Sequence, residues 1–267
     1  MFDIQTIMYF LLLGSFVGVI SGLFGIGGGG IIVPILTMIF LSKGMDQSTV
    51  VHLALGTSMS IIIITSISSV RAQQKKKAIE WNIVKLMVPG ILVGTFLATF
   101  IASKLDSFYL SLIFSLFMFY SAMQMFIDKK PKVESGLFSK KTQVLSGSLI
   151  GGLSALVSIG GGILSVPYLV MQNIDIRRAI ATSSAIGVPI AVAGTFGYIL
   201  NGLDSTSFSD YSIGYVNLAA FLCVSVASFL TAPIGVMLVH KIEVKLMKKL
   251  FAILPLVLSI KMIYSLI

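Results

Sequence analysis

Long segments without a single charged side chain are the strongest constraint on this chain. Among them are residues 4–42, 107–127, 142–174 and 179–203. A helix that crosses the hydrocarbon core of a bilayer needs about 20 apolar residues, so each segment can hold one span. The segments 4–42 and 142–174 are too long for one such helix and too short for two. The chain is therefore expected to be embedded in a membrane and to be interrupted in these two places.

The composition agrees with a membrane protein and excludes several other classes. Only 11% of the residues are charged and the mean hydropathy is +1.01, whereas a soluble domain carries about 25% charged residues. The single cysteine, Cys223, excludes an intrachain disulfide, and two histidines make a metal site with soft ligands unfavourable. We therefore expect no metal, no cofactor and no nucleic-acid partner, because the net charge of +9 indicates an asymmetry of membrane loops.

A glycine-rich motif occurs twice and divides the chain into two halves. Residues 14–36 align without gaps to residues 147–169, and 12 of the 23 positions are identical. Ala54–Ser60 is similar to Ala179–Ala185, and a further match follows near the end of each half. We interpret residues 1–138 and 139–267 as an N-terminal and a C-terminal repeat of one transmembrane domain.

Each repeat is expected to contain five helical segments. In the first half they are predicted near 4–24, 29–42, 50–70, 83–103 and 107–127. In the second half they are predicted near 142–158, 162–173, 177–200, 213–238 and 246–266. The segments after the glycines have about twelve residues, or about 18 Å, which is short of a bilayer core of about 30 Å. The fold class is therefore all-α and polytopic, with a glycine-broken helical hairpin and three transmembrane helices in each repeat.

The distribution of basic residues predicts the orientation of the two repeats. Sixteen of the nineteen Lys and Arg residues fall in four clusters, within 71–85, 129–141, 177–178 and 241–249. Cytoplasmic loops are enriched in such residues, so the four clusters are placed inside and both termini outside. Three crossings per half then invert the second repeat relative to the first. We expect a multi-pass protein of a bacterial cytoplasmic membrane, a monomer or homodimer with membrane lipids as partners.

The glycine breaks are candidates for an anion-binding site at membrane depth. Irregular backbone within a bilayer must be shielded by protein or line a polar cavity, and a helix that begins there directs free N–H groups and a positive dipole end at a ligand. Inverted repeats would bring two such helix ends together, as in many transporters. The predicted substrate-binding residues are Gly27, Gly28, Gly29, Gly30, Gly160, Gly161, Gly162, Thr57, Ser58, Thr182, Ser183 and Ser184. Pro34 and Pro167 are expected to set the bend of the short helices.

These motifs also allow simpler interpretations. Glycines in membrane helices often serve close packing, and hydroxyl groups often bond back to their own helix. Gly25, Gly27 and Gly30 also spell the G-x-G-x-x-G pattern of dinucleotide sites, with Asp46 at roughly the distance of a ribose-binding acid. A dinucleotide site is rejected because the motif lies in an uncharged segment and the second copy has Ser158 and Ile163 at the outer glycine positions.

With both motifs in both halves, the chain resembles the TauE/SafE family of sulfite exporters and toluene-sulfonate permeases. The resemblance rests on G-x-G-G-G-x-x-x-x-P from Gly25 to Pro34, on its copy from Ile159 to Pro167, and on A-x-x-T-S at Ala54 and Ala179. It covers essentially the whole chain. The resemblance implies transport of sulfur-containing anions such as sulfite and organosulfonates across a bacterial membrane. Because Ser158 replaces the glycine found at Gly25, the two half-sites are not expected to be equivalent.

The function expected from these observations is export of a small anion. Uptake of the same anion and an ion channel with a backbone filter are the alternatives. An enzyme is not expected, because every Asp and Glu falls in a predicted loop or at a helix end and no catalytic constellation is evident.

Overall fold

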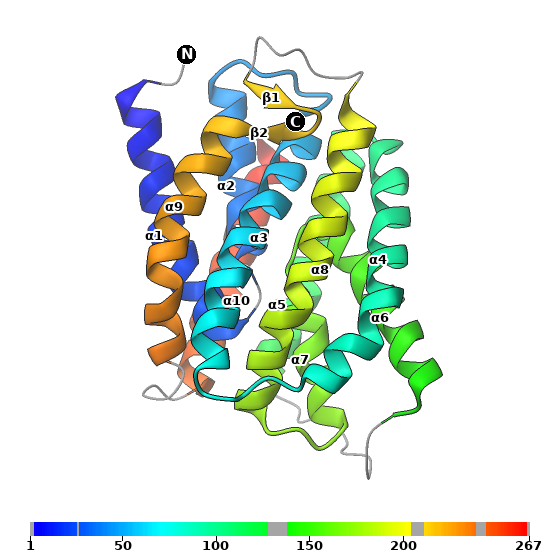
Figure 1. The fold of residues 1–267 in the computed structure, drawn as a ribbon. Helices are drawn as coiled ribbons and strands as arrows, with labels where there is room; N and C mark the ends of the chain where they lie inside the picture. Colours follow the sequence, from blue (N-terminus) through cyan, green and yellow to red (C-terminus); the bar gives the residue numbers. More distant parts are fainter. Residues whose placement is uncertain (1–2, 26, 128–137, 204–210, 239–243, 266–267) are drawn as a thin grey trace.

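The computed structural model describes residues 3–25, 27–127, 138–203, 211–238 and 244–265 of the chain. Helices dominate these residues (Figure 1), and the only strands described are two short ones. The helices of the first half are α1 (Ile4–Phe24), α2 (Gly29–Ser42), α3 (Val50–Gln74), α4 (Trp81–Ser103) and α5 (Ser107–Ile127). Those of the second half are α6 (Lys140–Val157), α7 (Gly162–Met171), α8 (Ile176–Gly202), α9 (Leu218–Leu238) and α10 (Val244–Tyr264).

Helix lengths confirm an all-α polytopic membrane protein. Among the described residues, α1, α3, α4, α5, α8 and α9 are long and apolar enough to cross a bilayer. The helices that follow the glycines have 14 and 10 residues, or about 21 and 15 Å, and cannot cross alone. The predicted helical segments therefore match the observed ones closely. The link at 128–137 and the loop at 204–210, which carried part of the orientation argument, lie outside the described residues.

The two broken hairpins open toward opposite ends of the bundle. The start of α1, the end of α2 and the end of α10 lie at one end (Figure 1). The loop between α3 and α4 and the starts of α6 and α8 lie at the other end (Figure 1). Glu80 in that loop forms an ion pair with Arg178 at the start of α8, with 2.8 Å between Glu80 Oε1 and Arg178 Nη2. Basic residues 71–77 and 177–178 therefore share one end of the molecule.

Small residues bring helices of the two halves into close contact. Helix α1 packs along α9, and α6 packs along α4. A Cβ atom built on Gly22 of α1 would lie 2.0 Å from the carbonyl oxygen of Ala232 in α9. One built on Gly94 of α4 would lie 2.1 Å from the carbonyl oxygen of Ser148 in α6. Such contacts let helix backbones approach closely where lipid supplies no hydrophobic drive for association. Helices α3 and α8 pack against each other in the centre and are largely buried.

The start of α9 differs from the sequence prediction. A helix was expected from residue 213, but β1 (Ser212–Ile213) pairs antiparallel with β2 (Val216–Asn217) and α9 begins at Leu218. The Asn217 side chain explains the late start, because its Oδ1 accepts a hydrogen bond of 3.0 Å from the N–H of Ala220 and so caps the helix. The turn between the strands buries Tyr215 against His52 of α3, with 5.0 Å between the ring centroids.

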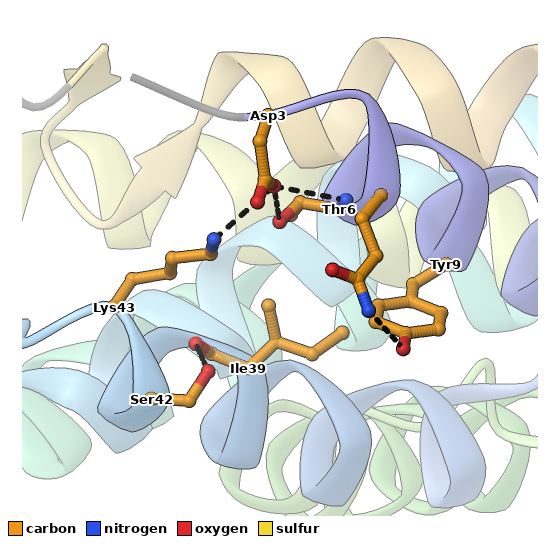
Figure 2. Close-up of polar contacts among 7 residues, drawn as sticks. Asp3, Thr6, Tyr9, Ile39, Ser42 and Lys43 are labelled. Atoms are coloured by element: carbon orange, nitrogen blue, oxygen red, sulfur yellow. Dashed lines mark hydrogen bonds and ion pairs between the residues drawn. The ribbon is translucent and has the colours of Figure 1, made fainter.

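The open end of each hairpin is closed by polar side chains. Lys43 Nζ lies 3.2 Å from Asp3 Oδ1, which joins the end of α2 to the start of α1 (Figure 2). Hydrogen bonds from Thr6, and secondarily Lys43, lower the pKa of Asp3 to about 2. Its favourable contacts are thus present above the ordinary pKa of 3.8 and are lost as the pH falls through about 2. In the second hairpin, Gln143 Nε2 donates to Gln172 Oε1 at 2.6 Å.

Candidate functional site

The two glycine breaks touch each other in the interior of the bundle. A Cβ atom on Gly27 would lie 3.3 Å from Cα of Gly160, and one on Gly29 would lie 1.6 Å from the carbonyl oxygen of Ser158. All of the predicted glycines are buried. Gly30 does not face the other break, because its Cβ would lie 3.2 Å from Met118 Sδ of α5. Backbone from both halves therefore crosses at one place, which side chains larger than hydrogen would push apart.

The two breaks share one backbone geometry. Gly28 and Gly161 cap the starts of α2 and α7, and each has φ +81°. This left-handed conformation is costly for a residue with a Cβ atom. A Cβ on Gly28 would also lie 2.2 Å from Val17 Cγ1, and one on Gly161 would lie 2.7 Å from Ile190 Cδ1. Glycine is therefore required at both positions for conformation and for space.

Within the described residues, each break leaves backbone N–H groups without partners. In α2, Ile31 and Ile32 both donate to the carbonyl oxygen of Gly28, and the N–H groups of Gly29 and Gly30 have no partner among the described residues. In α7, the N–H groups of Leu164 and Ser165 donate to the carbonyl oxygen of Gly161. The N–H groups of Gly162 and Ile163 likewise have no partner among the described residues. Pro34 lies inside α2 and Pro167 inside α7, each five residues after the first residue of its helix. Four donors at two helix N-termini thus lie near one crossing point.

One face of α3 lies against this crossing and carries an unpaired hydroxyl group. The carbonyl oxygen of Leu55 accepts a hydrogen bond of 2.9 Å from Ser158 Oγ. Two turns along α3, the side chain of Ile62 faces Gly27 and Gly29. Ser58 lies between these two contacts, is fully buried, and its Oγ has no hydrogen-bond partner among the described residues. A buried hydroxyl without a partner costs about 1–3 kcal/mol, which a ligand can recover.

The equivalent hydroxyls on α8 are already engaged. Ser183 Oγ donates to the carbonyl oxygen of Gly25 at 3.1 Å and accepts from Ser165 Oγ at 2.8 Å. Ser184 Oγ bonds back to Ile180 of its own helix at 3.2 Å. The half-sites therefore differ, with Ser58 unpaired on one side and Ser183 locked into a hydrogen-bond chain on the other. Ser165 begins this chain, and Ser158 bonds separately to Leu55 of α3. Neither serine was predicted as a site residue. The sequence signal for them is a polar residue where the first repeat has Ile32 or Gly25.

The two predicted threonines each hold the start of a helix from the other half. Thr57 Oγ1 accepts a hydrogen bond of 2.8 Å from the N–H of Asn217, which precedes α9. Thr182 Oγ1 accepts one of 3.0 Å from the N–H of Glu80, which precedes α4. Neither Glu80 nor Asn217 was predicted near the site. No sequence pattern within one half could reveal them, because both contacts join residues more than 100 positions apart.

This arrangement can bind an anion and offers little for covalent chemistry. The crossing presents backbone N–H groups and, among the described residues, the unpaired hydroxyl of Ser58. Glu80, whose N–H bonds to Thr182, forms an ion pair with Arg178. Over the described residues there is no cluster of His, Cys, Asp and Glu that could hold a metal ion.

Comparison with known proteins settles the family. A model of the family described as Sulfite exporter TauE/SafE matches residues 10–262. The chain belongs to the TauE/SafE sulfite exporter family. A "Probable membrane transporter protein" of Haemophilus influenzae is 34% identical over 257 residues, which cover 96% of this chain and 97% of that protein. One from Methanocaldococcus jannaschii is 31% identical over 240 residues, covering 88% and 87%. No solved structure matches the chain.

Membership in the TauE/SafE family confirms part of the functional prediction. The protein is a multi-pass membrane transporter, and its relatives are named as transporters rather than enzymes. YdhB of Bacillus subtilis, 30% identical over 229 residues that cover 81% of this chain and 86% of YdhB, carries the same description.

Proposed function

We propose that this transporter exports a small sulfur-containing anion, such as sulfite or an organosulfonate, which binds where the two glycine breaks cross. The observation that carries the proposal is the meeting of two helix N-termini with free N–H groups beside the unpaired, buried hydroxyl of Ser58. Each N-terminus carries roughly half a positive charge, so two of them favour a negative ligand. The family description supplies the substrate class.

The carbonyl groups at the crossing argue against a cation-selective filter. Such a filter needs free carbonyl oxygens directed at the ion. Here the carbonyl oxygens of Gly25 and Leu55 already accept hydrogen bonds from Ser183 and Ser158. The groups that the two helix N-termini direct at the crossing are N–H donors, which favour an anion.

We further propose that residues 1–138 and 139–267 are inverted repeats, with both termini outside a bacterial cytoplasmic membrane. Packing of α1 on α9 and of α6 on α4 supports the repeat, because each pair joins the first helix of one half to the fourth of the other. The opposed openings of the two hairpins support the inversion (Figure 1). The lysines at 75–77 support a cytoplasmic location for the α3–α4 loop.

The orientation can be tested with single cysteines in a Cys223→Ser background. Ser42 and Lys77 are exposed at opposite ends of the bundle (Ser42 is drawn in Figure 2). In intact cells, a membrane-impermeant thiol reagent is expected to label Ser42→Cys and to leave Lys77→Cys unlabelled until the membrane is broken. The reverse pattern would overturn the proposed orientation.

Ser58→Ala tests the site itself. We expect anion affinity to fall about tenfold, because a hydroxyl that donates to a charged ligand contributes about 1.5–3 kcal/mol. Thermal stability without ligand should be unchanged or higher, because the hydroxyl has no partner to lose. Ser69→Ala is the matched control, since Ser69 is also buried and unpaired on α3 but lies about three turns further along the helix.

Binding of sulfite, thiosulfate, taurine and sulfoacetate to the purified protein should be measured for wild type and both variants by thermal shift and calorimetry. If Ser58→Ala and Ser69→Ala both bind these anions with wild-type affinity, the hydroxyl of Ser58 does not contact the ligand. If wild-type protein neither binds nor transports any of the four anions, the proposed function is wrong.

A further inference from the structure

Glu80 is held by two different contacts with the start of α8. Its carboxylate pairs with Arg178, with 2.8 Å between Oε1 and Nη2. Its backbone N–H donates to Thr182 Oγ1, one turn further along α8. The next residue, Ser183, donates to the carbonyl oxygen of Gly25 at the glycine crossing. A line of polar contacts thus runs from an exposed arginine at the end of the bundle to the proposed site.

Among the described residues, the equivalent contact at the other end of the bundle has no ion pair beside it, because the pair at that end, Lys43–Asp3, joins α1 and α2 instead. Thr57 is the equivalent of Thr182, and Asn217 donates to it as Glu80 does to Thr182. The residue equivalent to Arg178 is Leu53, which is buried. There the closure is made by Tyr215, whose ring lies on His52 and whose N–H donates to the carbonyl oxygen of Tyr198 at 3.2 Å. The contact at the start of α4 is therefore flanked by an ion pair, and the equivalent contact at the start of α9 is flanked by aromatic rings.

We infer that Arg178 is the residue that receives the transported anion, and that the anion opens this end by displacing the Glu80 carboxylate. The inference rests on the proposed function. Both side chains are substantially exposed, at 51% for Arg178 and 30% for Glu80. An exposed ion pair contributes little to stability, so a second anion can compete for the guanidinium. Arg presents two parallel N–H donors that suit the planar or tetrahedral oxygens of a sulfur oxyanion.

Release of Glu80 has a structural consequence along the line of contacts. The carboxylate and the backbone N–H belong to one residue, so movement of Glu80 away from Arg178 also strains its bond to Thr182. The start of α4, at Trp81, is then held less firmly to the start of α8. An anion bound to Arg178 lies one helical turn from Thr182, which is followed directly by Ser183. Among the described residues, the aromatic contact between Tyr215 and His52 at the other end includes no ion pair that an anion could break in this way.

The test compares charge variants by their effect on entry from each face. In oriented proteoliposomes, the half-saturating concentration of sulfite, thiosulfate and sulfoacetate is measured separately on the two faces. We expect Arg178→Gln to raise it about tenfold on the Arg178 face, as for loss of one charge-assisted hydrogen bond, and to leave the opposite face unchanged. Glu80→Gln removes the competitor and should lower it on the same face. Arg178→Lys should recover part of the loss.

Arg177→Gln is the matched control, because Arg177 is the adjacent exposed arginine and has no ion pair among the described residues. Equal effects of Arg177→Gln and Arg178→Gln on the half-saturating concentration would mean that only the surface charge matters, and would overturn the inference. Effects of Glu80→Gln and Arg178→Gln in the same direction would also overturn it, since competition requires opposite signs. If transport occurs and both variants behave as wild type, the inference fails while the proposed function stands. If wild type transports none of the three anions, the proposed function fails instead.

Discussion

Gly161→Val is expected to abolish transport, and Gly28→Val to do the same from the other half. Gly161 has φ +81°, which valine adopts only at high cost, and its Cβ would lie 2.7 Å from Ile190 Cδ1. The added methyl groups would also cover the free N–H groups at the start of α7. Transport should therefore fall below detection in both variants, measured as anion flux in proteoliposomes of matched protein content.

Graded variants separate a lost site from a lost fold. Ile190→Val removes the Cδ1 atom that the new Cβ would meet, so Gly161→Ala combined with Ile190→Val retains only the backbone strain, about 1–2 kcal/mol. We expect this double variant to be folded and to transport slowly. Gly152→Ala is the control, because its Cβ would meet nothing closer than 3.4 Å. A folded Gly161→Val that transports at the normal rate would show that the glycines serve packing alone.

The sequence could predict the glycine breaks because their signals are local. Length limits of the bilayer, the short apolar segment after each motif and the duplicated pattern all act within one half of the chain. Gly28 and Gly161 lie at helix starts because a short apolar helix follows each glycine motif. The two breaks were expected to converge, and the structure places Gly27 next to Gly160.

The partners of the hydroxyl groups could not be predicted, because they are set by contacts between the halves. Thr57 and Thr182 were expected to face a ligand, and each instead accepts an N–H group from the helix start of the opposite half. Ser58 and Ser183 occupy equivalent positions in the repeat, yet one is unpaired and the other is bonded twice. The difference arises from single residues, Ser165 against Ile32, whose effect depends on three-dimensional packing.

Export driven by the membrane potential is the second large expected effect. Of the described acidic residues, none lies at the crossing of the glycine breaks, where a proton relay through a carboxylate would need one. An anion leaving a negative interior gains about 2.3 kcal/mol per charge per 100 mV. A divalent anion gains about 4.6 kcal/mol, which corresponds to an equilibrium concentration ratio of roughly a thousandfold. Facilitated export can then proceed without a second coupled ion.

Proteoliposomes loaded with sulfite, with the potential clamped by potassium and valinomycin, test this mechanism. Efflux should accelerate when the interior is made negative, reverse its preferred direction when the interior is made positive, and be unaffected by an imposed pH gradient. Transport that follows the pH gradient and ignores the potential would exclude it. In that case His52 would be the candidate proton carrier, because it is buried at the start of α3 and its Nδ1 is unpaired among the described residues. His52→Gln would be expected to abolish pH-driven transport in that case, whereas potential-driven export should survive this change.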